Sequence, residues 1–205
     1  KVASGGSTSN TIHGLARLGA KTGYIGKISE DPMGAFFKQD LLHSQITPHL
    51  VISPCDTGIA TTFMTPDAER TFATYLGAAA DLQPEDIDNA IFRDYQYIHV
   101  EGYLVFNHDL IEHVCQQAKK HGLLLSMDMG SYNVMEQNRD FVLHLLENYV
   151  NIIFGNEEEV KAVSGKDESA ALDFLSHYCD VSVVKLGKRG SLVKMNNTIY
   201  TIPPV

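Results

Sequence analysis

The chain is short of basic residues. Its 205 residues include 16 lysines and arginines against 25 aspartates and glutamates, which gives a formal net charge of −9. A general nucleic-acid surface needs a positively charged footprint, so this balance argues against nucleic acid as a partner. It does not argue against a phosphate ligand, because a single local pocket can hold one.

Cysteine is also scarce, with Cys55, Cys115 and Cys179 far apart and no C-x-x-C motif. An odd, scattered set predicts free thiols in a reducing compartment, which we expect to be the cytoplasm. No apolar run reaches the length of a membrane span and no signal peptide is recognisable, so we expect no membrane partner.

Several motifs of known chemistry are missing from the sequence. There is no G-x-G-x-x-G, no Walker A spacing and no G-x-S-x-G, so neither a P-loop nor a serine nucleophile elbow is supported. The 9 histidines show no paired metal spacing such as H-E-x-x-H, and none of them is assigned as a ligand.

A glycine-rich stretch at the start of the chain is the first candidate site. Gly5 and Gly6 precede three small hydroxyl residues and Asn10, and apolar residues then follow at near-helical spacing. This pattern predicts a loop that opens a helix, with one of residues 7–9 as the N-cap. Glycines allow a ligand close to the backbone, and the Asn10 amide suits a pair of sugar hydroxyls. A plain turn before a capped helix is the alternative.

The second half of the chain alternates strands with helices, which predicts an α/β fold with a mostly parallel sheet covered by helices. Strands are expected at 22–26, 97–101, 123–128, 150–154 and 181–186, helices at 32–43, 84–93, 108–121, 139–149, 156–164 and 169–178, and a closing hairpin at 191–195 and 199–202.

Residues 48–80 have a different sequence pattern, in which threonines and aromatics alternate with apolar residues. Strands are expected at 49–52, 60–65 and 70–76, with a turn at 66–69. This suits an antiparallel sheet with one face in water. We interpret the block as a small β insertion in an α/β domain made of residues 1–47 and 81–205.

Polar residues follow the ends of the predicted parallel strands, at Glu101, Asp128, Asn156 and Lys185. In open α/β sheets, ligands bind beyond the carboxyl ends of the strands. Glu101, with a glycine after it, could grip a sugar hydroxyl. The alternative is an ordinary solvated acid at a strand end.

Asn156 and Glu159 open a predicted helix directly after a strand. Asn156 is a good N-cap, and acids in the first turn favour the helix dipole, which is a sufficient structural explanation. Glu159 lies three residues further on, on the same helix face, and could also hold a magnesium ion through water.

The turn from Lys185 to Gly190 carries three positive charges and two glycines, Gly187 and Gly190. Backbone N–H groups and positive charge at such a turn attract phosphate, so we interpret it as nucleotide-facing. A surface loop with solvated lysines is the alternative.

Taken together, these motifs resemble the ribokinase-like (PfkB) carbohydrate kinases. The opening glycines with Gly19 and Gly26 resemble the first family signature, Asn156-x-x-Glu159 its magnesium and phosphate motif, and residues 185–190 its nucleotide-binding turn. Residues 48–80 match the place of the family's lid over the sugar.

The resemblance implies a three-layer α/β/α fold and ATP-dependent phosphorylation of a primary hydroxyl of a sugar or nucleoside. It places Gly5, Gly6, Asn10 and Glu101 at the sugar, and Asn156, Glu159, Lys185, Gly187 and Gly190 at ATP, with magnesium at Glu159. Residues 74–79 resemble the adenosine-kinase side, so adenosine is favoured. Fructose, ribose, ketodeoxygluconate or a non-catalytic sugar-binding domain are the alternatives.

The chain also departs from the family. The family's sugar-gripping Asp before the double glycine is absent, as is its Gly-Ala-Gly-Asp turn with the catalytic base, and residues 128–133 lack an Arg that often follows the strand-end Asp. Because the chain begins at Lys1 without Met, we expect a piece of a larger kinase, inactive by itself, with the base beyond residue 205. A monovalent cation site would lie mostly in the absent part, and a homodimer could form through the lid.

Overall fold

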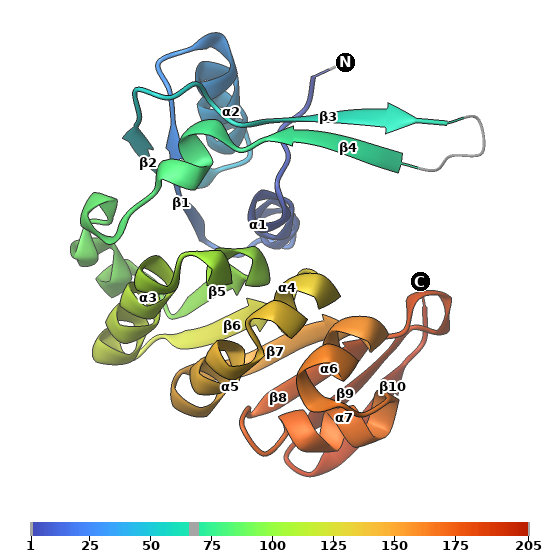
Figure 1. Ribbon diagram of the computed structural model, residues 1–205. Helices are drawn as coiled ribbons and strands as arrows, with labels where there is room; N and C mark the ends of the chain where they lie inside the picture. Colours follow the sequence, from blue (N-terminus) through green and yellow to red (C-terminus); the bar gives the residue numbers. More distant parts are fainter. Residues whose placement is uncertain (1, 66–69, 205) are drawn as a thin grey trace. The chain divides into compact units, whose positions relative to one another are not determined.

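The computed structural model describes residues 2–65 and 70–204. The chain divides into two compact units, Lys1–Ile87 and Asp88–Val205, whose elements are labelled in Figure 1. The predicted division into residues 1–47 with 81–205 and an insertion at 48–80 stays a prediction.

The first unit is built around a parallel pair of strands. Helix α1 (Ser7–Arg17) leads into β1 (Thr22–Ile28), which pairs with β2 (Ile46–Ile52) through the crossover helix α2 (Pro32–His43). Asp31 is the N-cap of α2, and its carboxylate accepts a 2.7 Å bond from the Gly34 amide. Pro32 at the first helical position suits this start, because its missing N–H would have no helical partner there.

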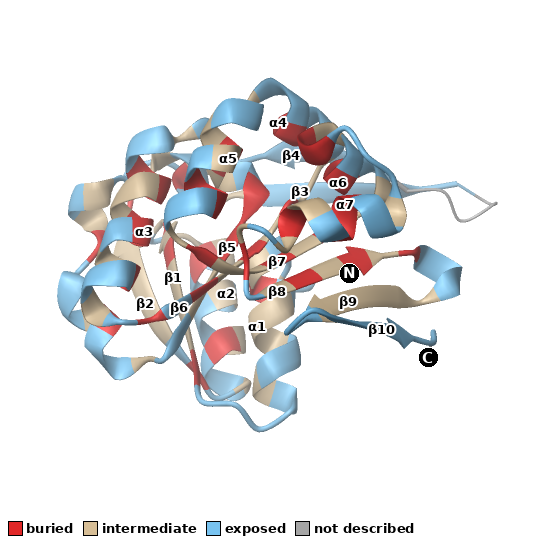
Figure 2. Ribbon diagram, turned by 90° about the horizontal axis from the view of Figure 1, so that it is seen from below, coloured by how far each residue is buried: buried red, intermediate tan, exposed pale blue. Residues whose placement is uncertain are grey.

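The block that follows differs from the prediction in two ways. Strands β3 (Ile59–Met64) and β4 (Arg70–Tyr75) do form an antiparallel hairpin, whose expected turn at 66–69 lies outside the described residues. Strand β2, however, pairs in parallel with β1 instead of joining them. Each residue of β3, and each of β4 from Thr71 on, is exposed, so the hairpin has no buried face (Figure 2). The alternation of threonine and apolar residues predicted one.

The second unit contains a six-stranded sheet in the order β10-β9-β8-β7-β6-β5. The strands are β5 (Tyr97–Glu101), β6 (Leu124–Asp128), β7 (Val150–Asn156), β8 (Val181–Lys185), β9 (Ser191–Met195) and β10 (Thr198–Ile202). Strands β5 to β8 are parallel, and β9 and β10 are antiparallel additions. The predicted hairpin turn is confirmed, because Asn196 and Asn197 both have positive φ, as a tight turn between twisted strands requires.

Five helices connect and cover these strands. They are α3 (His108–His121), α4 (Tyr132–Gln137), α5 (Arg139–Asn148), α6 (Glu157–Ser164) and α7 (Glu168–Leu175), all on one face of the sheet (Figures 1 and 2). Their apolar sides supply fully buried core residues such as Ile111, Leu145 and Leu172, and the strands supply Met127 and Ile153. Helix α4 was not predicted.

The predicted helix at 84–93 is wrong. The structure has two 3-10 turns instead, Pro84–Asp86 and Asn89–Asp94, together with similar turns at Gly77–Asp81 and Gly102–Phe106. Ile87 between the first two is extended, and the Asp88 carboxylate accepts a bond from the Ala90 amide, which starts a new turn. Aspartate competes with helical bonding in this way.

Two composition-based expectations also meet the structure. The three cysteines are free, as predicted, and burial raises the pKa of Cys115 and Cys179 to about 12. Within the described residues, no helix is both long enough and apolar enough to cross a membrane.

Candidate functional site

The tips of the parallel strands in the second unit bring the predicted polar residues together. In the sheet register, Glu101 at the end of β5 lies beside Asp128 of β6, and Asn156 of β7 lies beside Lys185 of β8. All four therefore stand at the carboxyl edge of one sheet, where parallel α/β sheets hold their ligands.

One ion pair crosses this edge. Lys185 Nζ donates a 2.6 Å hydrogen bond to Asp128 Oδ2, although β7 lies between their two strands. Asp128 also accepts a 3.0 Å bond from the Gly130 amide, which fixes the carboxylate at its strand end. The positive charge of Lys185 is thus held in place by a neighbouring acid.

Asn156 and Glu159 form a reciprocal capping box at the start of α6. The Glu159 amide donates 2.9 Å to Asn156 Oδ1, and the Glu159 carboxylate accepts 2.8 Å bonds from the backbone and side-chain nitrogens of Asn156. The predicted N-cap is confirmed, and two otherwise unpaired donors are satisfied by one pair of side chains.

Glu159 is also electrostatically linked to the other strand tips. Burial raises the pKa of its carboxyl group, Asn156 and Lys185 oppose that rise, and the charges of Asp128 and Glu101 add to it. Glu159 is buried, with 4% of its surface exposed, so it is not an ordinary solvated acid in the first turn of a helix.

Glu101 is buried as well, at 6% exposure, which rules out the solvated strand-end acid. His99, two residues earlier on the same strand face, places Nε2 3.4 Å from Glu101 Oε1 and Nδ1 2.9 Å from Ser126 Oγ. No sequence motif pointed to His99, although the two-residue period of a strand places it beside Glu101.

The residues after Glu101 pack tightly against β6. A Cβ on Gly102 would lie 2.0 Å from the carbonyl oxygen of Met129, so only glycine fits. Tyr103 Oη donates 3.0 Å to the Gly130 carbonyl. Burial raises the pKa of Tyr103, and the charges of Glu159, Glu101 and Asp128 raise it further. No sequence pattern pointed to Tyr103.

The turn after β8 is a closed 3-10 turn, Gly187–Arg189. The Gly190 amide donates 3.0 Å to the Gly187 carbonyl, and a Cβ on Gly190 would lie 2.0 Å from the Ile202 carbonyl oxygen. Gly190 is therefore required by packing against β10. Arg189, one of the three cations, is held by Glu157 at 2.5 Å and Glu168 at 2.8 Å.

The acidic residues at the strand ends fit only one way of binding magnesium, in which one carboxylate acts together with water and substrate phosphates. Among residues 2–65 and 70–204, no group of three or more His, Cys, Asp or Glu side chains is arranged to hold a metal. Magnesium usually keeps several waters and uses one or two carboxylates with substrate phosphates, so a single acid such as Glu159 suffices. The assignment of magnesium to Glu159 stays a prediction.

The remaining candidate residues lie in the first unit. Gly6 is the N-cap of α1, with a φ of 103° and without a side-chain cap, so the predicted hydroxyl cap is wrong. A glycine adopts that φ easily, and the helix starts one to three residues earlier than expected, which places the hydroxyl residues inside its first turn. Gly5, Gly6 and Asn10 are exposed, with open space beside both glycines. The assignment of these three residues to sugar binding stays a prediction.

Comparison with known proteins gives a family match. The family model described as "pfkB family carbohydrate kinase" matches residues 1–205. A 5-dehydro-2-deoxygluconokinase of Geobacillus thermodenitrificans is 28% identical over 92% of this chain and 61% of its own length. This chain thus spans about three fifths of that relative.

Solved structures agree on the fold. The adenosine kinase from Sinorhizobium meliloti superposes with a TM-score of 0.91 at 29% identity, covering 99% of this chain and 64% of its own. A probable sugar kinase from Rhizobium etli CFN 42 gives a TM-score of 0.91 at 28% identity, with the same coverage. The predicted α/β fold and the family resemblance are confirmed.

Proposed function

This chain belongs to the pfkB family of carbohydrate kinases, and we propose that the whole protein transfers the γ-phosphoryl group of ATP to a primary hydroxyl of a sugar or nucleoside. The observation that carries the proposal is the edge of the second unit's sheet, where Glu101, Asp128, Asn156 and Lys185 stand on successive parallel strands.

The proposed roles follow from the chemistry of each group. Glu101, buried beside His99, accepts a hydrogen bond from an acceptor hydroxyl, and Gly5, Gly6 and Asn10 bind the rest of the sugar. Lys185, held by Asp128, places a positive charge near the transferred phosphate, and the turn with Gly187 and Gly190 faces the nucleotide. Such transfer depends mainly on positioning and on charge stabilisation.

Magnesium would be held through water at Glu159, with Asn156 fixing the carboxylate. When bound, the ion neutralises charge on the β- and γ-phosphate oxygens. The catalytic base is proposed to lie in the part of the whole protein beyond residue 205, and the 205 residues by themselves are proposed to be inactive. A monovalent cation would also bind there.

The acceptor has two candidate classes. Residues 74–79 support adenosine, and a solved adenosine kinase is among the similar structures. The curated relatives named as 5-dehydro-2-deoxygluconokinases support a sugar acid instead. The comparisons favour neither, so the proposal is a primary hydroxyl on either class, in a cytoplasmic enzyme without nucleic-acid or membrane partners. A homodimer through the β3–β4 hairpin belongs to the same proposal.

The test is a panel of acceptors with full-length protein, ATP and magnesium. It includes adenosine, ribose, fructose, ketodeoxygluconate and 5-dehydro-2-deoxygluconate, with ADP formation as the readout and no acceptor as the control. We expect turnover on one class well above the others. No acceptor-dependent ADP formation with any of them would contradict the kinase proposal. ADP formation by the 205-residue chain would contradict its proposed inactivity.

A further inference from the structure

The β3–β4 hairpin is held mainly at its root. Its described residues are exposed on both strands, with Phe63 and Phe72 each 57% exposed (Figure 2). No buried face therefore fixes the direction of the hairpin, and its position depends on the two points where it leaves the rest of the first unit.

Two glycines allow the backbone at these two points to approach closely. A Cβ on Gly58 would lie 2.5 Å from the Leu76 carbonyl oxygen, and one on Gly77, whose φ is +50°, would lie 2.2 Å from the Asp56 carbonyl oxygen. The Ala78 amide donates 2.8 Å to that same Asp56 oxygen. The entry and exit of the hairpin are thus joined backbone to backbone.

Asp31 ties this root to the start of α2. Its Oδ2 accepts 2.8 Å from the Thr57 amide, and its Oδ1 accepts 2.8 Å from Thr57 Oγ1 and 2.7 Å from the Gly34 amide. The Thr57 hydroxyl oxygen in turn accepts 2.9 Å from the Ser29 amide. A helix cap needs only one acceptor oxygen, so the second oxygen of Asp31 serves the hairpin root.

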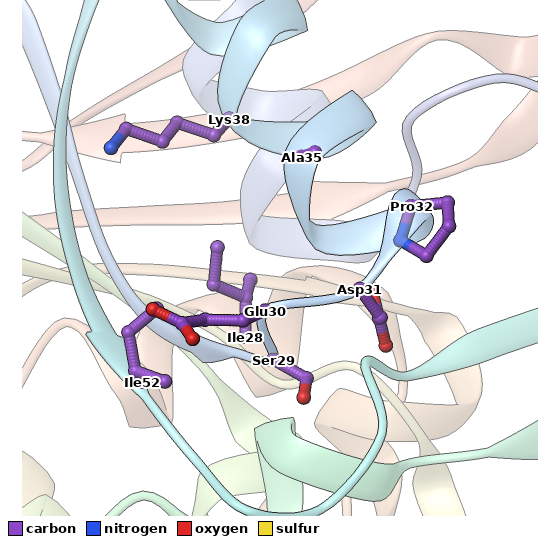
Figure 3. Close-up of a pocket in the computed structure, with 8 residues that line it drawn as sticks. All are labelled: Ile28, Ser29, Glu30, Asp31, Pro32, Ala35, Lys38 and Ile52. Carbon is purple, nitrogen blue, oxygen red and sulfur yellow. The ribbon is translucent and has the colours of Figure 1, made fainter.

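A hollow lies on one side of these hydrogen bonds, while Thr57 itself is buried. Asp31 lines a hollow of about 520 Å³ at the carboxyl ends of β1 and β2, shown with its lining residues in Figure 3. The Ser29–Asp31 loop and Thr57 are joined by hydrogen bonds from the Thr57 amide and hydroxyl to Asp31 and from the Ser29 amide to Thr57.

We propose that Asp31 is a positioning residue, which fixes the β3–β4 hairpin through Thr57 and so sets how the hairpin covers the acceptor. The last step rests on the proposed function and on the family resemblance, which implies that residues 48–80 form the lid over the acceptor. The tie itself stands on the hydrogen bonds of the first unit alone.

The decisive variant is Asp31→Asn in the full-length protein. Asparagine caps helices as well as aspartate, so α2 keeps its cap, but its amide nitrogen then faces the Thr57 N–H and cannot accept from it. We expect amide hydrogen exchange at residues 56–64 and 71–78 to rise about 10-fold, the effect of losing about 1.4 kcal/mol of local stability. Glu30→Gln removes the same charge from the preceding exposed residue and should leave exchange unchanged.

Activity supplies the second readout. Asp31→Asn should raise the KM for the acceptor several-fold while the KM for ATP changes little, because only the acceptor side is covered. Thr57→Val, which lacks the hydroxyl, should also exchange faster, and Thr57→Ser, which keeps it, should exchange at the wild-type rate. These two variants test the contact if Asp31→Asn does not fold.

Unchanged exchange in both Asp31→Asn and Thr57→Val would overturn the tie. Faster exchange with an unchanged acceptor KM would overturn its role in covering the acceptor. Wild-type protein without kinase activity would instead sink the proposed function, and the exchange result would still decide the tie.

Discussion

Lys185 and Asp128 stand on strands that are not neighbours, yet their side chains meet 2.6 Å apart across the tip of β7. The Lys185 side chain is 43% exposed and that of Asp128 22%, so the ammonium group is anchored without being buried. A cation held in this way can still contact an anionic ligand, because the pair leaves two of its three N–H donors available for other partners.

Replacing Lys185 by methionine tests this arrangement. Hydrogen bonds to charged groups contribute about 1.5–3 kcal/mol, so Lys185→Met should raise the KM for ATP by about 10-fold or more. Initial-rate kinetics of the full-length protein measure it. Lys188→Met removes an exposed cation from the same turn and is the matched control. An equal effect of both variants would show that only the net charge of the turn matters.

Glu159→Gln separates helix capping from magnesium binding. Glutamine also completes a capping box, so the melting temperature should change by less than about 2 °C. Loss of the carboxylate should raise the magnesium concentration for half-maximal activity about 10-fold, because magnesium prefers charged oxygen ligands.

Glu158→Gln is its control, since Glu158 is an exposed acid in the same first turn. The magnesium dependence of that variant should match the wild type. If Glu159→Gln behaves identically to Glu158→Gln, Glu159 is a structural cap and nothing more.

Local signals in the sequence predicted most of the second unit. Helix α3 runs from His108 to His121 as expected, because Asn107 caps one end and the left-handed Gly122 ends the other. Strand β5 also has its predicted bounds. Apolar runs with strong caps carry this information within a few neighbouring residues.

Other features depend on distant parts of the chain. The pairing of Lys185 with Asp128 requires the strand order, since β7 must lie between them. The parallel pairing of β2 with β1 likewise depends on the crossover through α2, while its residues resemble those of the hairpin strands. The role of Asp31 beyond capping appears only when Thr57 is folded against it.

Gly102→Ala should disturb the strand tips directly. The added Cβ would lie 2.0 Å from the Met129 carbonyl oxygen, so the backbone at the end of β5 or β6 must move. We expect a loss of about 3 kcal/mol in the free energy of unfolding, near the upper range for overpacking. Urea unfolding measures it. Gly14→Ala, in α1 with open space around its Cβ, is the comparison and should be neutral or stabilising. If Gly102→Ala is as stable as the wild type, the backbone at the strand ends can move to accept the added Cβ at no cost.

The stability of the first unit should depend on acid through Lys27 and Asp86. Lys27 Nζ lies 2.6 Å from Asp86 Oδ2, with the lysine side chain 9% exposed. The hydrogen bond from Lys27, helped by the Gln83 amide, lowers the pKa of Asp86 from its ordinary 3.8. The folded carboxyl therefore binds protons more weakly than the unfolded one. The stability it contributes is present above about pH 4 and is lost as the pH falls through the folded pKa.

Asp86→Asn removes this titration. Urea midpoints of the wild type should fall more steeply below pH 4 than those of Asp86→Asn. Between the folded and the unfolded pKa of Asp86, the wild-type carboxyl takes up a proton on unfolding, and asparagine cannot. Glu85→Gln changes the exposed acid next to it and should keep the wild-type slope. At the alkaline end, the bond to Asp86 raises the pKa of Lys27, so the same pair should lose stability only as the pH rises above the ordinary lysine pKa of 10.5. If the urea midpoints of the wild type and Asp86→Asn fall equally steeply below pH 4, Asp86 has the same pKa in the folded and the unfolded protein.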